Sequence, residues 1–385
     1  MIRATLAQAQ YFILQKSHLA NNPTANITDL ATTLAGLPAQ PSSTPYLSAW
    51  ARIKNFRPDT LTAALTQKHA LIKSELMRTT LYIVPPEQFV TLHAATARQR
   101  KKDYNAQFRL WGIETNEEIE RVAETVRNVL GNEPATVETI IGRVSPEEVQ
   151  ELTQTSRGGR VTGTSNVALA LRWLAAQAEL GVLNQTENWQ GEESLLYAPL
   201  NYWYPSLNLA DAPTEAEAQK ALVRDYIAAF GPVTQADISF WTGFGKSETA
   251  RAANALSGET IMTMVAGIPG MLLSLKSQAD VLASAGEPDE PIVNLLPAND
   301  PYTTAHRASR SRYFANASLQ RKVFSSSGAA KPTILVNGQI VGVWNWGEQL
   351  TWQLLTDVDP AVVLLIETRI EELAQFLQLQ AENQT

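Results

Sequence analysis

The residue of this chain best suited to chemistry is a glutamine in a proline-rich loop. Gln40 lies in the segment 36–46, where Pro38, Pro41 and Pro45 place three prolines within eight residues. Proline interrupts a helix, so this segment is expected to be a rigid loop. A carboxamide donates and accepts hydrogen bonds at once, so Gln40 can hold a water molecule. The alternative is that Gln40 bonds its own backbone.

Two further groups of residues carry the charge needed to bind phosphate. Arg157 and Arg160 lie in a glycine-rich turn before an expected helix start, where an anion is favoured. Five bases and no acid occur between residues 307 and 322, next to two aromatic residues, and this composition suits nucleic acid. The bases are Arg307, Arg310, Arg312, Arg321 and Lys322, and the aromatic residues are Tyr313 and Phe314. The alternatives are a flexible loop for the first group and a solvated helix face for the second.

The charge balance bears on the partner. A net charge of −7 argues against nucleic acid, because a DNA-binding protein usually has a basic surface. The acids are unevenly spread, however, and ten of them lie between Glu114 and Glu151. Separate basic patches on an acidic body can still bind phosphate. A protein-interaction scaffold without nucleic acid therefore stays open, and it predicts no salt-dependent affinity for DNA.

Other classes of function lack their signatures. The chain has no cysteine, and its four histidines are not spaced as a metal pair on one helix, so neither a metal site nor a cofactor is expected. Neither a Walker-type glycine loop nor a Gly-x-Ser-x-Gly elbow is present. The sequence contains neither a signal-peptide pattern nor an apolar run that could span a membrane, which predicts a cytoplasmic protein.

The elements that must position these residues are mainly helical, in a chain that is α+β overall. A length of 385 residues predicts two to four domains. Three successive segments combine helices with a short strand pair, which is typical of a winged helix. The third segment is the clearest, with a Thr242-Gly243 turn between two helices and strands expected at 261–265 and 271–275. The predicted domains are 1–113, 114–205, 206–276 and 277–385.

The first two segments contain less regular stretches. Residues 71–84 are expected to begin as helix and to end as strand, and residues 145–152 are expected to be helical. The last segment, 277–385, is expected to be a small β-barrel-like domain with a hairpin at Asn337-Gly338 and a closing helix at 359–379.

The order of these motifs resembles that of the AlkZ/YcaQ-type DNA glycosylases, a superfamily of tandem winged-helix proteins. The family loop reads roughly Gly-x-Gln-apolar-Gln, and here Gln40 matches the second glutamine whereas Pro38 stands at the first. The family segment Arg-Gly-Thr-Leu-His corresponds to Arg78-Thr79-Thr80-Leu81-Tyr82. Asp300 lies in a turn, 297–302, that is similar to a motif of the family's C-terminal domain.

The resemblance assigns roles to several of these residues. It implies that Gln40 handles the catalytic water and that Arg78 contacts a phosphate or stabilises the catalytic loop. It also implies that Asp300 lies near the site and that Tyr82 replaces a histidine. The alternatives are an ion pair for Arg78, a core position for Tyr82 and turn chemistry for Asp300.

Pro38 leaves three explanations open. Catalysis is lost, a neighbour such as Ser42 or Ser43 takes the place of the missing amide, or the substrate differs.

The function that the resemblance implies is the hydrolysis of the N-glycosidic bond of alkylated bases in DNA repair, by a monomer that binds double-stranded DNA. A base alkylated at a ring nitrogen is already cationic and leaves as a neutral group, so amide side chains can suffice for catalysis. The alternative is a catalytically silent winged-helix protein with a DNA-binding or regulatory role.

Overall fold

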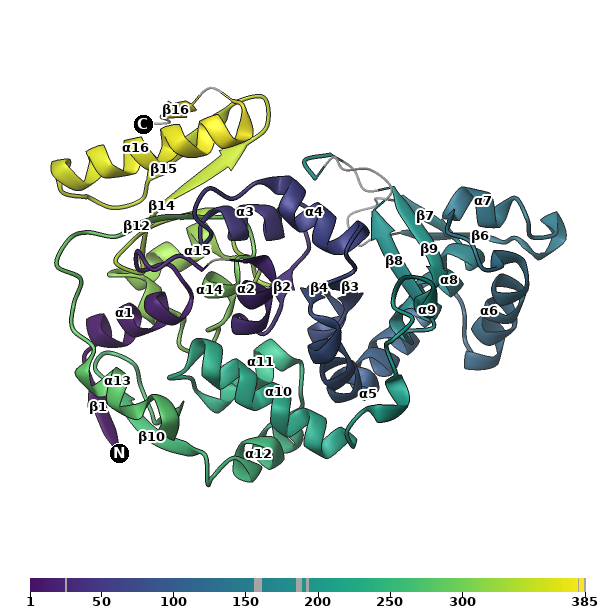
Figure 1. Ribbon diagram of the computed structural model, residues 1–385, viewed down its shortest axis with the longest axis horizontal. Helices are drawn as coiled ribbons and strands as arrows, with labels where there is room; N and C mark the ends of the chain where they lie inside the picture. Colours follow the sequence, from purple (N-terminus) through teal and green to yellow (C-terminus); the bar gives the residue numbers. More distant parts are fainter. Residues whose placement is uncertain (25, 156–160, 185–188, 192–193, 380, 384–385) are drawn as a thin grey trace. The chain divides into compact units, whose positions relative to one another are not determined.

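The computed structural model describes residues 1–385 apart from 25, 156–160, 185–188, 192–193, 380 and 384–385 (Figure 1). Contacts divide the chain into two units, one made of Met1–Arg57 with Gln219–Thr385 and the other of Pro58–Ala218. This boundary falls inside the predicted first domain, 1–113, so the first 57 residues pack with the C-terminal part of the chain. The division into four domains remains a prediction.

The first unit contains the helix-turn-helix and the strand pair expected in the third segment. Thr234 caps the second helix through a capping box with Asp237. Gly243 ends that helix at a φ of 81°, in the left-handed region that glycine adopts without strain. The elements are α10 (Glu215–Phe230), α11 (Gln235–Thr242), α12 (Lys246–Ala255), β10 (Thr260–Val265) and β11 (Leu272–Leu275). These local predictions are confirmed. The start of α10, up to Ala218, belongs to the second unit.

A strand at the chain start completes this part of the fold. Residues Ile2–Ala4 form β1, which pairs in parallel with β10, and β10 pairs antiparallel with β11. The pairing joins segments about 260 residues apart in the sequence, with Ile2 opposite Thr263. No local pattern predicts such a partner.

The last part of the first unit is an open sheet with a helix beside it (Figure 1). Its strands follow the order β12 (Val293–Leu296), β13 (Thr333–Val336), β14 (Gln339–Trp346), β15 (Leu350–Leu354) and β16 (Ala381–Asn383). The β13–β14 hairpin turns at Asn337-Gly338 as predicted, and α16 (Pro360–Leu377) is the closing helix. The prediction of a β-barrel is not confirmed, because the hydrogen-bonded strands form a linear order.

The first helix, α1 (Leu6–Lys16), anchors the core of this unit. It buries Phe12, Ile13 and Leu14 in a cluster with residues of β13 and of α13 (Ala279–Ser284). Gln10 is also buried, and its amide donates to the Arg312 carbonyl at 2.6 Å. None of the helices in the described ranges is both long and apolar enough to cross a membrane.

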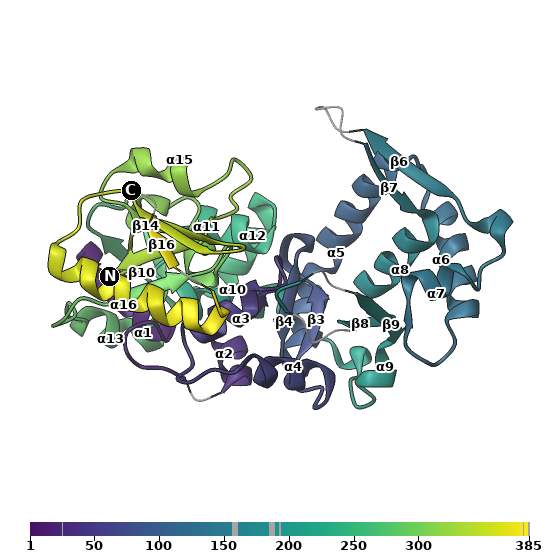
Figure 2. The ribbon, with the colours of Figure 1, turned by 90° about the horizontal axis from the view of Figure 1, so that it is seen from above.

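The second unit has a helical core with three short hairpins (Figure 2). In it α6 packs against α8, and both contribute to one apolar cluster that also contains Tyr104 and Phe108 of α5. The helices are α4 (Pro58–Thr66), α5 (Pro86–Leu110), α6 (Asn116–Leu130), α7 (Val137–Ile141), α8 (Asn166–Ala176) and α9 (Leu200–Trp203). The strands are β3 (Ile72–Glu75), β4 (Leu81–Val84), β5 (Ala135–Thr136), β6 (Glu151–Thr155), β7 (Val161–Ser165), β8 (Leu180–Asn184) and β9 (Leu195–Pro199).

Two of these hairpins correct the sequence predictions. The helical start expected in 71–84 is strand β3, which pairs antiparallel with β4. The helix expected at 145–152 is a 3-10 turn at Pro146–Glu148 followed by β6, which pairs with β7. The threonine-rich sequences of β6 and β7 favour strands, because β-branched side chains suit a pleated surface.

Candidate active site

The loop that carries Gln40 is held between two short helices of the first unit. Helix α2 (Ile27–Thr33) ends before it, and Ala35 and Gly36 have φ values of 52° and 107° that reverse the chain direction. Leu37 and Ala39 are buried and anchor the loop in the core, whereas Gln40 is exposed. The side chain of Gln40 forms no hydrogen bond with another described residue. Its amide is therefore available to a water molecule or a ligand.

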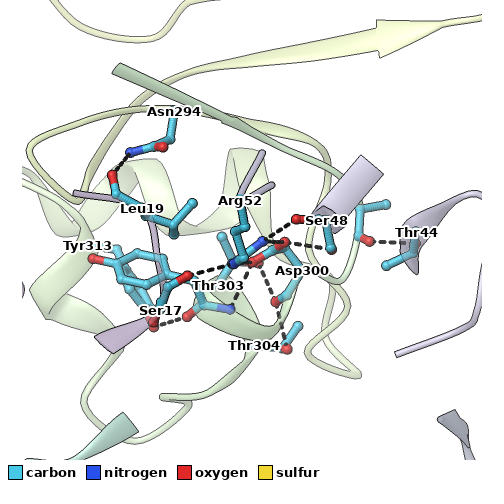
Figure 3. Close-up of polar contacts among 12 residues, drawn as sticks. Ser17, Leu19, Thr44, Ser48, Arg52, Asn294, Asp300, Thr303, Thr304 and Tyr313 are labelled. Carbon is cyan, nitrogen blue, oxygen red and sulfur yellow. Dashed lines mark hydrogen bonds and ion pairs between the residues drawn. The ribbon is translucent and has the colours of Figure 1, made fainter. Parts of the chain in front are cut away.

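Two hydrogen bonds join this loop to the turn at 297–300. The side-chain amide of Asn299 donates to the Gln40 carbonyl at 3.2 Å. The Thr44 hydroxyl, at the start of α3 (Thr44–Trp50), donates to the Ala298 carbonyl at 2.9 Å (Figure 3). Both ends of the segment 40–44 are thus bonded to residues about 255 positions later in the chain.

A buried ion pair lies beneath these contacts (Figure 3). Arg52 follows α3, and its Nη2 and Nη1 donate to the two carboxylate oxygens of Asp300 at 2.7 and 2.8 Å. Both side chains are 0% exposed. The Arg52 Nε donates to the Ser17 carbonyl at 2.9 Å, so the guanidinium also bonds to the end of α1.

Asp300 has no free acceptor for a substrate. Besides Arg52, it accepts from the Ser48 hydroxyl at 2.7 Å and from the Tyr302 backbone N–H at 2.9 Å. The second of these contacts caps α14 (Pro301–Thr304). Asp300 therefore lies close to the Gln40 loop, as the resemblance implied, but its geometry is that of a residue that positions α3.

The remaining loop residues lie beside Gln40. Pro38 belongs to the two-residue strand β2 (Leu37–Pro38) and is half-buried. Ser42 and Ser43 are half-buried, and Ser43 stands at the N-cap of α3 without a side-chain capping bond. The positions of these residues are compatible with each of the three explanations for Pro38.

Arg78 and Tyr82 lie in the second unit, on the β3–β4 hairpin and its turn. Arg78 is exposed, and it and Thr79 have φ values of 56° and 54°, which non-glycine residues seldom adopt. Thr79 occupies the position at which the family segment has glycine. Burial raises the pKa of Tyr82 to about 12, against opposing effects of the Arg78 charge and of a hydrogen bond with Thr80. Tyr82 is therefore a neutral hydrogen-bonding group at pH 7 and does not reproduce a histidine's titration.

The basic segment 307–322 does not form one surface. Arg307, Arg321 and Lys322 are exposed, with Arg321 and Lys322 on α15 (Gln320–Val323). Arg310 is 9% exposed and its guanidinium lies over the Phe324 ring at 3.7 Å. Arg157 and Arg160 lie outside the described residues.

The position of Arg312 contradicts the prediction that it contacts DNA. It is 1% exposed, and its guanidinium donates to the Pro232 carbonyl and the Ser309 hydroxyl at 3.0 and 3.1 Å. A side chain enclosed in this way cannot reach a phosphate. Its basic neighbours gave it the pattern of a surface residue, although its contacts are those of the core.

Arg312 also contacts a buried histidine whose titration bears on stability. His306 Nε2 lies 3.0 Å from Arg312 Nη1, and His306 Nδ1 lies 2.6 Å from the Tyr313 hydroxyl. Burial, and then the charge of Arg312, lower the pKa of His306 to about 3, against the opposing charge of Asp237. His306 is therefore neutral in the folded protein at pH 7.

We expect acid to destabilise the first unit through His306. An unfolded histidine has a pKa of about 6.5, so between about pH 6.5 and 3 the unfolded chain binds one more proton than the folded one. The free energy of unfolding should then fall with falling pH by up to about 1.4 kcal/mol per pH unit from this residue. Urea unfolding at several values between pH 5 and 6.5 should give a shallower pH slope for His306→Gln than for wild type.

The slope is the informative quantity, because the substitution also removes hydrogen bonds at every pH. Burial alone would raise the pKa of Asp237, but the interaction with His306 and the hydrogen bonds with Ser309 and Thr234 outweigh it and hold that pKa below its ordinary value. His93 in the second unit also has a pKa of about 3, owing first to burial, and is unchanged in both proteins. Equal slopes for wild type and His306→Gln would contradict the prediction.

Sequence reasoning missed two residues that hold the site, Arg52 and Asn299. The signal for Arg52 was a charge just after a helix that has no other charged residue. The signal for Asn299 was an asparagine in a turn, where it tolerates the left-handed conformation. Neither signal names the partner.

Comparisons with known proteins show the family of this chain and a solved structure of similar fold. The sequence model of the family described as DNA glycosylase AlkZ-like matches residues 31–377. No curated protein matches the chain. Among solved structures, the Streptomyces sahachiroi DNA glycosylase AlkZ is similar over 100% of both chains, with a TM-score of 0.77 and 18% sequence identity.

Proposed function

The chain belongs to the AlkZ-like family of DNA glycosylases, and we propose that it hydrolyses the N-glycosidic bond of alkylated bases in duplex DNA, with Gln40 holding the attacking water. The observation that supports this most is the position of Gln40. Its side chain is exposed and forms no bond to the described protein, while its backbone carbonyl accepts a hydrogen bond from Asn299, the residue before the buried Asp300. A fixed backbone with a free amide is the arrangement that a water-positioning residue requires.

The chemistry needs no strong acid at the base. Water attacks C1′ of the sugar as the C–N bond breaks, and the bonding electrons pass to the cationic alkylated base. The base leaves neutral, the sugar gains a hydroxyl, and the water's second proton goes to solvent. Gln40 would accept a hydrogen bond from the water and orient its lone pair toward C1′. This mechanism selects for bases that already carry a positive charge.

The proposed DNA surface uses the exposed cations. Arg307, Arg321 and Lys322 can each neutralise a phosphate, whereas Arg312 cannot. We also propose that the chain contains three winged-helix segments followed by the open C-terminal sheet, with α10–α12 and the β10–β11 wing as the third winged helix. The proposed protein acts as a monomer in the cytoplasm.

A second candidate function rests on Pro38. Proline has no side-chain amide, so one of the two glutamines of the family loop is missing. A catalytically silent protein that binds or regulates DNA would keep the fold and the cations without the reaction.

The test is base release from a duplex that carries one N7-methylguanine or one N3-methyladenine. With wild-type enzyme in excess, we expect abasic sites to accumulate, measured as alkali-labile strand breaks on a denaturing gel. The same duplex without the lesion is the control and should stay intact.

Binding separates the alternatives. Affinity for the duplex should fall steeply as salt rises, by a log–log slope of about −0.9 for each phosphate contact. Binding without release of the base from any alkylated duplex would overturn the proposed enzymatic function and favour a catalytically silent DNA-binding protein. Absence of salt-dependent binding would favour the scaffold without nucleic acid.

A further inference from the structure

We propose that Asn299 is the residue that positions Gln40, an inference that rests on the proposed function for its catalytic consequence. Asn299 is a positioning residue in this proposal, because it acts through the backbone of Gln40 and does not touch the reacting atoms. The geometry that carries it is a set of three hydrogen bonds made by one half-buried residue, two by its side chain and one by its backbone N–H.

Asn299 connects the Gln40 loop to the segment before β13. Its Nδ2 donates to the Gln40 carbonyl at 3.2 Å, and its Oδ1 accepts from the Ala330 N–H at 2.9 Å. Its own N–H donates to the Ala330 carbonyl at 3.2 Å. The side chain therefore has a fixed orientation before it reaches Gln40.

The residue next to Asn299 makes this connection rigid. Asp300 is held by Arg52 and Ser48 in the core, so the backbone on one side of Asn299 has little freedom to move. Asn299 has a φ of 57°, a conformation that asparagine tolerates better than most other residues. Asparagine thus suits both the positive φ at this position and the hydrogen bond to Gln40.

The position of Gln40 matters more in this chain than it would in a loop that has both glutamines of the family motif. Pro38 supplies no second amide, so the placement of the water rests on one side chain. That side chain has no bond to another described residue, and the contact with Asn299 holds the backbone from which it extends. A small displacement of a positioned group can cost about 10²-fold in rate.

Two substitutions separate the contact to Gln40 from the contact to Ala330. Asn299→Asp keeps an acceptor for the Ala330 N–H but has no donor for the Gln40 carbonyl. Asn299→Gly tolerates the positive φ and removes both contacts. We expect both variants to release base from the N7-methylguanine duplex about 10- to 100-fold more slowly than wild type in single-turnover assays, with unchanged affinity for the duplex.

The matched control is Asn337, a second asparagine with positive φ in the same unit. It has a φ of 50°, and its Oδ1 accepts from the Ile292 N–H at 2.8 Å. Asn337→Gly and Asn337→Asp should leave the single-turnover rate within about twofold of wild type.

Hydrogen exchange tests the positioning without relying on activity. Mass spectrometry of peptides that cover residues 39–44 should show exchange about fivefold faster in Asn299→Gly than in wild type, the factor expected for one lost hydrogen bond of ordinary strength. Asn337→Gly should leave this segment unchanged.

The outcomes distinguish this inference from the proposed function. Faster exchange with no base release by wild type would support the positioning and overturn the proposed function. Unchanged exchange in Asn299→Gly, or an undiminished rate in both Asn299 variants of an active enzyme, would overturn the inference.

Discussion

Replacing Gln40 with alanine should slow base release by about 10²- to 10³-fold, the usual cost of removing one preorganised polar group from an active site. The side chain is exposed and has no described protein partner, so its loss should leave folding and duplex affinity unchanged. The measurement is the single-turnover rate of abasic-site formation on the N7-methylguanine duplex, beside the dissociation constant for the same duplex.

Gln349→Ala is a matched control, because Gln349 is an exposed glutamine of the same unit that lies in a turn. It should release base at the wild-type rate. A Gln40→Ala protein that also retains the wild-type rate would show that another group holds the water. In that case Ser42→Ala and Ser43→Ala decide whether a neighbouring hydroxyl performs the role.

Replacing Asp300 with alanine should lower the free energy of unfolding by about 3–5 kcal/mol, because it leaves the Arg52 guanidinium buried without its counter-ion. Both partners are 0% exposed, so solvent cannot take over the lost contacts. The measurement is urea unfolding of wild type and variant at pH 7, followed by tryptophan fluorescence.

A surface pair of the same chemistry provides the control. Arg98 and Glu215 lie 2.8 Å apart, but their side chains are 64% and 37% exposed. Glu215→Ala should therefore change the free energy of unfolding by less than about 1 kcal/mol. A double variant, Arg52→Ala with Asp300→Ala, should cost less than the sum of the two single variants, since it removes the unpaired charge. A loss of about 1 kcal/mol or less for Asp300→Ala would contradict the role assigned to the pair.

The first prediction concerns catalysis and the second concerns stability, and both concern the Gln40 loop and the residues that hold it. In the proposed function Gln40 holds the attacking water and is expected to contribute little to stability, whereas the buried Arg52–Asp300 pair is expected to stabilise the fold and holds α3 beside the loop. Asn299 and Thr44 connect them. If the proposed function is correct, a substitution in the loop should abolish activity without unfolding the protein, and a substitution in the ion pair should unfold it.

Sequence determined the parts of this protein that depend on near neighbours. The Asn337-Gly338 hairpin and the glycine that ends α11 follow from local backbone preferences, and they occur as predicted. The prediction of a loop over 36–46 is correct only around Gln40, because Leu37–Pro38 forms β2 and α3 begins at Thr44. Pro45 lies in the first turn of α3, where its missing N–H costs no hydrogen bond. The family motif also lies within a few residues, so Gln40 was recognised as the candidate for holding water.

Tertiary structure decided which distant segments meet, and burial followed from that. The pairing of β1 with β10, the ion pair across 248 residues between Arg52 and Asp300, and the burial of Arg312 all come from long-range packing. The segment 307–322 was predicted to be a continuous basic surface, because the sequence shows which residues are charged but not which are buried. A charged side chain can be buried only where distant groups satisfy its hydrogen bonds, and local sequence does not contain those partners.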